Sequence, residues 1–228
     1  MGKGFRRLQE RLADPLLTTL TIMIAVLLFV VAPLQVAGAI TEHYVSFVFV
    51  AVLILAAFTL SGSRLAFGAI LVAIALIVVS VAVEFQRSSI VEIYLDVIAW
   101  LIAGLTLSIV VARGVFAPGK VTFHRIIGAV LLYLSIGWIF VGLFSFVVLL
   151  VPEAFKGFEP SQENFISIAG NLIHFSFVTL TTTGYGDISP VHPYARSLAN
   201  LEAIIGQLYP PILLARLVTL ELEGGHIS

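Results

Sequence analysis

The run Thr182–Asp187, with the sequence TTGYGD, is a polar, glycine-rich turn between two strongly apolar segments. Its two glycines give the backbone access to conformations that other L-residues resist. In such conformations successive carbonyl oxygens can line up on one side of the chain and replace the water shell of a cation. The chemistry that these residues predict is therefore the coordination of an ion by backbone oxygens.

This turn resembles the selectivity filter of the tetrameric potassium channel family, in which four T-V-G-Y-G loops surround the ion. Thr183 is a mild departure, because the family usually has valine or isoleucine there. The preceding residues, Phe175–Thr181, resemble the pore helix of that family. The alternative is an ordinary Gly-Tyr-Gly turn of a soluble protein, which the apolar segments on both sides disfavour.

The resemblance implies roles for the turn and for the residues around it. Potassium would be coordinated by the Thr182 hydroxyl and by backbone carbonyls of the filter residues Thr182, Thr183, Gly184, Tyr185 and Gly186. Residues expected to support the filter are Asp187, His174, Phe175, Val178, Thr181 and Glu202. The C-terminus of the pore helix would direct its partial negative charge at the central cavity and favour a cation there.

His174 and Phe175 stand where the family often has a tryptophan that hydrogen-bonds the aspartate of the outer mouth. Two interpretations of His174 stay open: it donates this hydrogen bond to Asp187, or it only packs under the outer loop. Val178 stands where some members have a glutamate behind the filter, so this sequence lacks that carboxylate pair. Glu202 is expected behind the pore helix, hydrogen-bonded to threonine or backbone groups.

The last apolar segment carries one glycine and two prolines close together. Gly206 lies 20 residues after Gly186, where the family often has a hinge glycine. Pro210 and Pro211 cannot donate the backbone hydrogen bonds that residues 206 and 207 would accept, so a bend over 206–211 is expected. The residues assigned to the hinge and the inner cavity are Gly206, Gln207, Pro210, Pro211 and Leu214.

Composition restricts the class of protein. Of the 228 residues 60% are apolar and only 11% are charged, with a mean hydropathy of +1.10, so no soluble surface can be assembled from them. The chain has no cysteine, which rules out disulfides and thiolate metal sites. Its motifs include no hydrolase, nucleotide or metal-protein constellation. We therefore expect no enzyme, no organic cofactor and no nucleic-acid partner, but a chain surrounded by membrane lipid.

The expected fold class is an all-α membrane protein with six transmembrane helices, a re-entrant pore helix and a selectivity-filter loop. The predicted spans are Leu16–Val36, Tyr44–Leu60, Leu65–Val83, Ile93–Ala112, Ile126–Val151 and Ala195–Leu220, and the predicted pore helix is Leu172–Thr181, capped by Asn171. A cleaved signal peptide is disfavoured, because the first apolar run is longer than the usual 7 to 15 residues. Residues 1–14 are either an interfacial helix or a basic tail.

The basic residues give an orientation. With both termini in the cytoplasm, 9 of the 12 lysines and arginines fall inside, as the positive-inside rule requires of a multi-pass protein of the cell membrane. The turn then lies in the outer half of the membrane. Because one chain supplies one filter loop, the resemblance implies a homotetramer.

The resemblance divides the chain into a four-helix domain similar to a voltage sensor (1–112), a cytoplasmic linker (113–125) and a pore domain (126–228). The fourth span departs from a voltage sensor, because Ile93–Ala112 contains Asp96 and no lysine or arginine. The expected function is a potassium-selective channel, with potassium ions in the filter, that passes K⁺ down its electrochemical gradient without steep voltage gating.

Two alternatives to a channel stay open. They are a non-conducting or regulatory membrane subunit, and a subunit of a potassium transporter. The gating stimulus is not predicted: lipid, membrane tension, a partner protein, or pH acting through His124 or His174 all fit the sequence.

Overall fold

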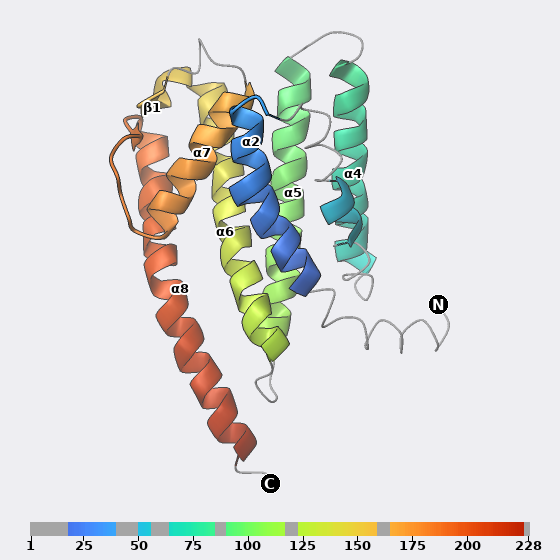
Figure 1. Cartoon of the computed structure of the whole chain (residues 1–228), viewed down its shortest axis with the longest axis vertical. Helices are drawn as coiled ribbons and strands as arrows, with labels where there is room; N and C mark the ends of the chain where they lie inside the picture. The colour runs from blue at the N-terminus through green and yellow to red at the C-terminus, as the bar shows by residue number, and fades with distance from the viewer. Residues whose placement is uncertain are drawn as a thin grey trace.

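The computed structural model describes residues 18–39, 50–55, 64–84, 90–116, 123–158 and 165–225, most of which lie in helices (Figure 1). In chain order the elements are a helix over 18–26, η1 (Leu27–Val31), α2 (Ala32–Val36), a short helix over 50–55, α4 (Arg64–Glu84), α5 (Ile90–Val115), α6 (Phe123–Leu150), η2 (Pro152–Ala154), β1 (Phe155–Lys156), α7 (Phe165–Leu180), β2 (Ser189–Pro190) and α8 (Pro193–Gly225). The helix over 18–26, η1 and α2 follow one another without a break.

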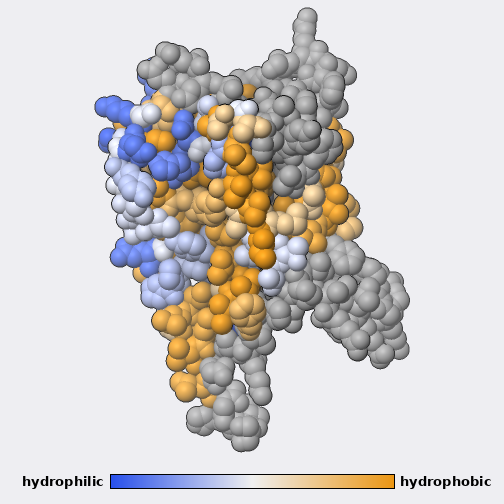
Figure 2. All heavy atoms as spheres, in the orientation of Figure 1, coloured by the Kyte–Doolittle hydropathy of each residue, from blue (hydrophilic) through white to orange (hydrophobic). Residues whose placement is uncertain are grey.

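Four of the described helices are long and apolar enough to cross a membrane. Their apolar stretches are Thr18–Val36, Ile93–Arg113, Arg125–Leu150 and Pro193–Thr219. A helix satisfies its own backbone hydrogen bonds, as a hydrocarbon environment requires. Figure 2 shows apolar residues along the sides of the helices, while hydrophilic residues gather mainly where α7, β1 and the start of α8 meet. The architecture is that of an all-α membrane protein.

The first, fourth, fifth and sixth predicted spans coincide with these four helices. The third coincides with α4, whose described apolar stretch, Ala66–Ser80, is shorter than the other four. The second, Tyr44–Leu60, is described only over the helical residues 50–55, and residues 1–14 lie outside the described part. The six-span count therefore stays a prediction.

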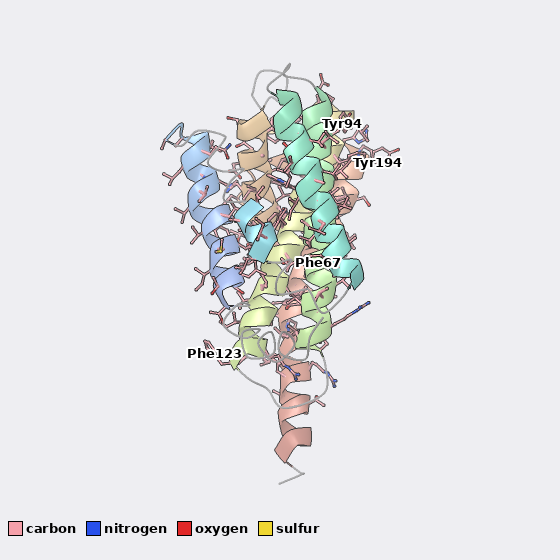
Figure 3. All side chains as sticks on the ribbon, turned by 90° about the vertical axis from the view of Figure 1, so that its right-hand side faces the viewer. Phe67, Tyr94, Phe123 and Tyr194 are labelled. Atoms are coloured by element: carbon pink, nitrogen blue, oxygen red, sulfur yellow. The ribbon has the colours of Figure 1, made fainter. Side chains whose placement is uncertain are left out.

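Neighbouring helices in the sequence also pack side by side. α4 packs on α5 and α5 on α6, and α6, α7 and α8 all contact one another. In Figure 3, Tyr94 of α5 and Tyr194 of α8 lie toward one end of the molecule and Phe123 of α6 toward the other. Because Tyr94, Tyr194 and Phe123 all lie near the N-terminal ends of their helices, α6 runs opposite to α5 and α8.

The helices on both sides extend into the predicted linker 113–125. α5 continues through Arg113 to Val115, and α6 already begins at Phe123. Residues 113–115 are compatible with a helix, and the first helix-breaking residue is Pro118, so the helix extends past the predicted boundary. The remaining linker residues, 117–122, lie outside the described part.

The aromatic core between α6 and α7 holds the second half of the chain together. The Phe144 ring is fully buried and packs edge-to-face against Phe155 and Phe175, with ring centroids 5.7 and 5.0 Å away. Phe155 and Phe175 also contact each other, at 5.1 Å. Each buried aromatic pair adds about 0.5–1.5 kcal/mol to the burial of its apolar area. This core joins α6, β1 and α7 into one unit.

α7 begins earlier than predicted, at Phe165. No proline separates Phe165 from Asn171, so the helix forms upstream and Asn171 lies inside it instead of capping it. After α7 the chain turns back, and β2 pairs antiparallel with β1, with Phe155 opposite Pro190 and Lys156 opposite Ser189. α7 and the turn therefore form an excursion that starts and finishes at the same end of the molecule (Figure 1).

Candidate functional site

The backbone of the TTGYGD turn alternates between two mirror-related conformations. The φ angles of Thr182, Gly184 and Gly186 are +57°, +61° and +78°, whereas Thr183 and Tyr185 have negative φ. Alternating signs of φ end the helix and allow successive carbonyl groups to line up on one side of the chain. The glycines are needed for this conformation and not for space, because a Cβ added to Gly184 or Gly186 meets no atom within 4 Å.

The turn begins at the C-terminus of α7, which its first amide groups cap. The N–H of Thr182 donates to the Thr179 carbonyl over 2.9 Å, and the N–H of Thr183 donates to Val178 over 2.9 Å. The N–H of Gly184 also reaches the Val178 carbonyl, at 3.4 Å. These bonds satisfy helix-end carbonyls that otherwise lack partners and fix where the row of turn carbonyls starts.

Two threonine side chains join the helix end to the turn. The Thr181 hydroxyl donates to the Phe177 carbonyl at 2.6 Å and lies 2.9 Å from the Thr183 hydroxyl. The Thr183 hydroxyl, which valine or isoleucine would lack at this position, therefore has a hydrogen-bond partner. The sequence predicted Thr181 as a support but gave no indication of this pairing.

An acid–imidazole pair joins the C-terminal end of the turn to α7. His174 Nε2 lies 2.8 Å from Asp187 Oδ2, and the His174 and Tyr185 rings are stacked, with centroids 6.0 Å apart and an interplanar angle of 3°. This is the geometry of the first of the two interpretations left open for His174. Both side chains are partly exposed, at 42% and 56%, so water reaches the pair.

Asp187 is also held by the backbone. Partial desolvation acts to raise the pKa of its carboxyl, but hydrogen bonds from the N–H of Ile188 and from His174 outweigh it and hold this pKa below the ordinary value of 3.8. The carbonyl oxygen of Asp187 lies so close to Gly157 that a Cβ there would overlap it, and Gly157 has a φ of +105°. The C-terminal end of the turn thus contacts both α7, through His174, and Gly157.

Phe175 and Val178 have different surroundings from His174. Phe175 is buried in the aromatic core and takes no part in the His174–Asp187 pair. Val178 is half-buried, and its carbonyl oxygen accepts hydrogen bonds from the N–H groups of Thr183 and Gly184. Both residues therefore act on the turn through the position of α7.

Glu202 lies behind α7, as predicted, with a fully buried side chain. Its hydrogen-bond partner is the Ser176 hydroxyl, 2.6 Å from Glu202 Oε1. The prediction named threonine or backbone groups instead. A serine inside an apolar helix was the available signal, because a buried hydroxyl requires a partner.

Gly206 is a site of close helix packing. A Cβ at this position would overlap the carbonyl oxygen of Leu180, the last residue of α7. α8 continues as a helix through Pro210 and Pro211, so the bend and its role as a gate stay predictions. Gln207, Pro210, Pro211 and Leu214 all lie on exposed parts of α8 in a single chain.

Two tyrosines that the sequence did not single out also hold this region. The Tyr133 hydroxyl of α6 donates to the Leu180 carbonyl at 3.1 Å, and the Tyr209 hydroxyl of α8 donates to the Ala129 carbonyl at 2.7 Å. Their rings lie 5.5 Å apart. Tyr133 thus ties the end of α7 to α6, and Tyr209 ties α8 to α6.

The turn offers uncharged oxygens to a ligand. Within the described residues, no group of three or more His, Cys, Asp or Glu side chains is arranged to hold a metal ion. The turn instead carries backbone carbonyls and threonine hydroxyls, and the Thr183 hydroxyl lies 2.9 Å from that of Thr181. The turn follows the C-terminus of α7, which carries partial negative charge. Such an arrangement suits a cation that binds through dipoles.

The comparisons with known proteins agree with this chemistry. Residues 120–222 match a family model described as an ion channel, and this stretch contains α7, the turn and most of α8. The comparisons with curated proteins and with solved structures find no match. The family match supports an ion channel, and with the apolar helices it supports a membrane protein.

Proposed function

We propose that four copies of this chain assemble around an axis as a potassium-selective channel, with the Thr182–Gly186 turns facing one another across it. The carbonyl oxygens of the turns and the Thr182 hydroxyls replace the water around K⁺, which passes down its electrochemical gradient. The observation that carries the proposal is the alternation of φ along the turn, because this alternation allows the carbonyls of one chain to form a row.

One row cannot surround an ion, and the exposed surface of the single chain supports assembly. Tyr185, in the middle of the turn, is 72% exposed in the single chain. α8 likewise exposes a series of large apolar side chains: Leu201, Ile204, Leu208, Ile212, Leu214, Val218 and Leu222. Four-fold symmetry buries part of this surface and closes the ring of carbonyls.

The uncharged ligands favour a monovalent ion. Ca²⁺ and Mg²⁺ sites in proteins are built mainly with carboxylates. The only carboxylate of the turn, Asp187, is engaged by His174 at the outer mouth. A ring of carbonyl dipoles binds K⁺ well enough to replace its water and weakly enough to release it.

The test is ion flux through the purified protein in liposomes, followed by reversal potentials in mixed K⁺ and Na⁺. We expect a reversal potential close to that of K⁺. Equal permeability to the two ions would refute the selectivity, and no flux would favour a non-conducting subunit. A particle with one chain instead of four would favour a transporter.

Gly184→Ala is the matched probe of the backbone. Its Cβ meets no atom within 4 Å in the chain, but left-handed φ costs an alanine about 1–2 kcal/mol. We expect selectivity to fall. Gly68→Ala in α4 adds the same methyl group at another uncrowded position, without a left-handed φ, and should leave selectivity unchanged. Equal effects of the two substitutions would refute this role of the turn.

A further inference from the structure

A polar junction lies behind the turn, where α6, α7 and α8 meet. Its members are Gly137 of α6, Ser176 of α7 and Glu202 of α8, and both side chains are fully buried. A carboxyl group inside an apolar bundle costs free energy unless it is hydrogen-bonded. Its presence therefore requires an explanation that apolar packing does not give.

The hydrogen-bond count identifies what Glu202 supplies. Ser176 Oγ lies 2.6 Å from Glu202 Oε1 and 3.0 Å from the Gly137 carbonyl oxygen. The hydroxyl has one hydrogen, so it cannot donate to both acceptors. Two full hydrogen bonds form here when the carboxyl group is protonated and donates to Ser176, while Ser176 donates to the Gly137 carbonyl. The junction is then a relay from α8 through α7 to α6.

The relay sets the register of α8 against α7. Ser176 and Leu180 lie one turn apart on α7, and Glu202 and Gly206 lie one turn apart on α8. Ser176 bonds Glu202, and the Leu180 carbonyl lies against Gly206. The Ser176–Glu202 contact and the Leu180–Gly206 contact therefore lie one helical turn apart in the same interface between α7 and α8. This interface ends at Leu180, two residues before Thr182.

We propose that Glu202 is a positioning residue for the filter, which acts through Ser176 and needs a hydrogen-bond donor at this site rather than a charge. It fixes the register of the inner helix against the pore helix and so transmits the position of α8 to the Thr182–Gly186 carbonyls. The inference rests on the proposed channel function, because the filter is what it positions.

The first test compares Glu202→Gln with Glu202→Met in reversal-potential measurements. Glutamine keeps the shape and offers N–H donors to Ser176, whereas methionine is unbranched like glutamate but donates nothing. We expect Gln to keep K⁺/Na⁺ selectivity within about twofold and Met to lower it about tenfold, the change that about 1.4 kcal/mol produces. Glu153→Gln, at an exposed site, is the control and should have no effect. If Gln lowered selectivity as much as Met, the donor relay would be refuted.

The second test is a double-mutant cycle on the thermal unfolding of the purified protein. The cycle combines Ser176→Ala with Glu202→Met. Ser176→Ala removes only one oxygen, so it can also be measured alone if Glu202→Met folds poorly. We expect the double variant to lose less stability than the sum of the single losses, because both remove the same contact. Additive losses would refute the relay. The unfolding temperature can be measured whether or not the protein selects K⁺. If the wild type proved unselective, the proposed function would be refuted, and the double-mutant cycle would still test the hydrogen bonds of the junction.

Discussion

Among the single residues of the turn, Thr182 has the most unusual backbone conformation. The left-handed φ of Thr182 is the least expected value, because an L-residue with a branched Cβ rarely adopts it. Capping of α7 by the amide groups of the turn imposes it, starting with the bond from Thr182 to Thr179. The TTGYGD pattern predicted the two glycine conformations but not this one.

The two neighbouring threonines should differ in effect. Thr182→Ala removes the hydroxyl assigned as a potassium ligand, so we expect weaker K⁺ binding and lower K⁺ conductance. Thr183→Val removes a hydroxyl whose partner, Thr181, keeps its bond to the Phe177 carbonyl, so we expect selectivity to be retained. Single-channel conductance and reversal potentials in planar bilayers measure both. A larger loss for Thr183→Val than for Thr182→Ala would contradict these assignments.

The His174–Asp187 pair predicts acid sensitivity of the outer mouth. The pKa of Asp187 is lower in the folded protein than in the unfolded chain, so its stabilising effect is complete above the ordinary value of 3.8 and is lost as the pH falls through the folded pKa. We expect current to decline reversibly when the outer solution is brought below about pH 4. Asp187→Asn should abolish this step, and an unchanged acid response in that variant would assign it to another group.

At the scale of elements, the sequence predicted the helices better than their contacts. Apolar length alone located four spans, because the length of a membrane helix is set by the hydrocarbon thickness. Local pattern could not show that β1 pairs with β2, because Phe155 and Pro190 lie far apart in the chain. Nor could it show that Ser176 and not a threonine meets Glu202, because that partner is decided by how α8 lies on α7.

Gly206 illustrates the same limit, and its substitution tests the helix interface. The sequence assigned Gly206 to a hinge, which stays a prediction. The structure adds that it lies against the Leu180 carbonyl, where a Cβ has no room. We expect Gly206→Ala to force α8 away from α7 and to lower the unfolding temperature of the protein. A glycine-to-alanine change normally stabilises an unhindered helix by about 0.5–1 kcal/mol, so Gly68→Ala in α4 should not show this loss. If both variants behaved alike, close packing at Gly206 would be excluded.

The whole molecule combines a pore-like half with a half whose role the sequence leaves open. α6, α7 and α8 carry the turn and its supports, and the family match covers this region. α4 packs on α5 and α5 packs on α6, so a motion of α4 can be passed through α5 to the helices that carry the turn. Whether the membrane potential drives such a motion depends on the charges that these helices carry.

We expect the channel to lack steep voltage dependence. Residues 93–112 of α5 contain no lysine or arginine, and Arg113 lies in the last turn of the helix, where it crosses little of the field. One elementary charge moved through 100 mV contributes about 2.3 kcal/mol, and true sensors move three to four charges in each of four subunits. With at most a fraction of a charge per subunit, the same voltage biases opening by only a few kcal/mol.

The measurement is open probability against membrane potential in a planar bilayer. Equal K⁺ concentrations on both sides prevent rectification by the ion gradient. We expect an effective gating valence of about one or less for the assembled channel, far below the roughly 12 to 16 of four complete sensors. An effective valence above about four would contradict the prediction, because the charges of α5 cannot supply it. Such a result would require that charged residues of another span cross the membrane field when the channel opens.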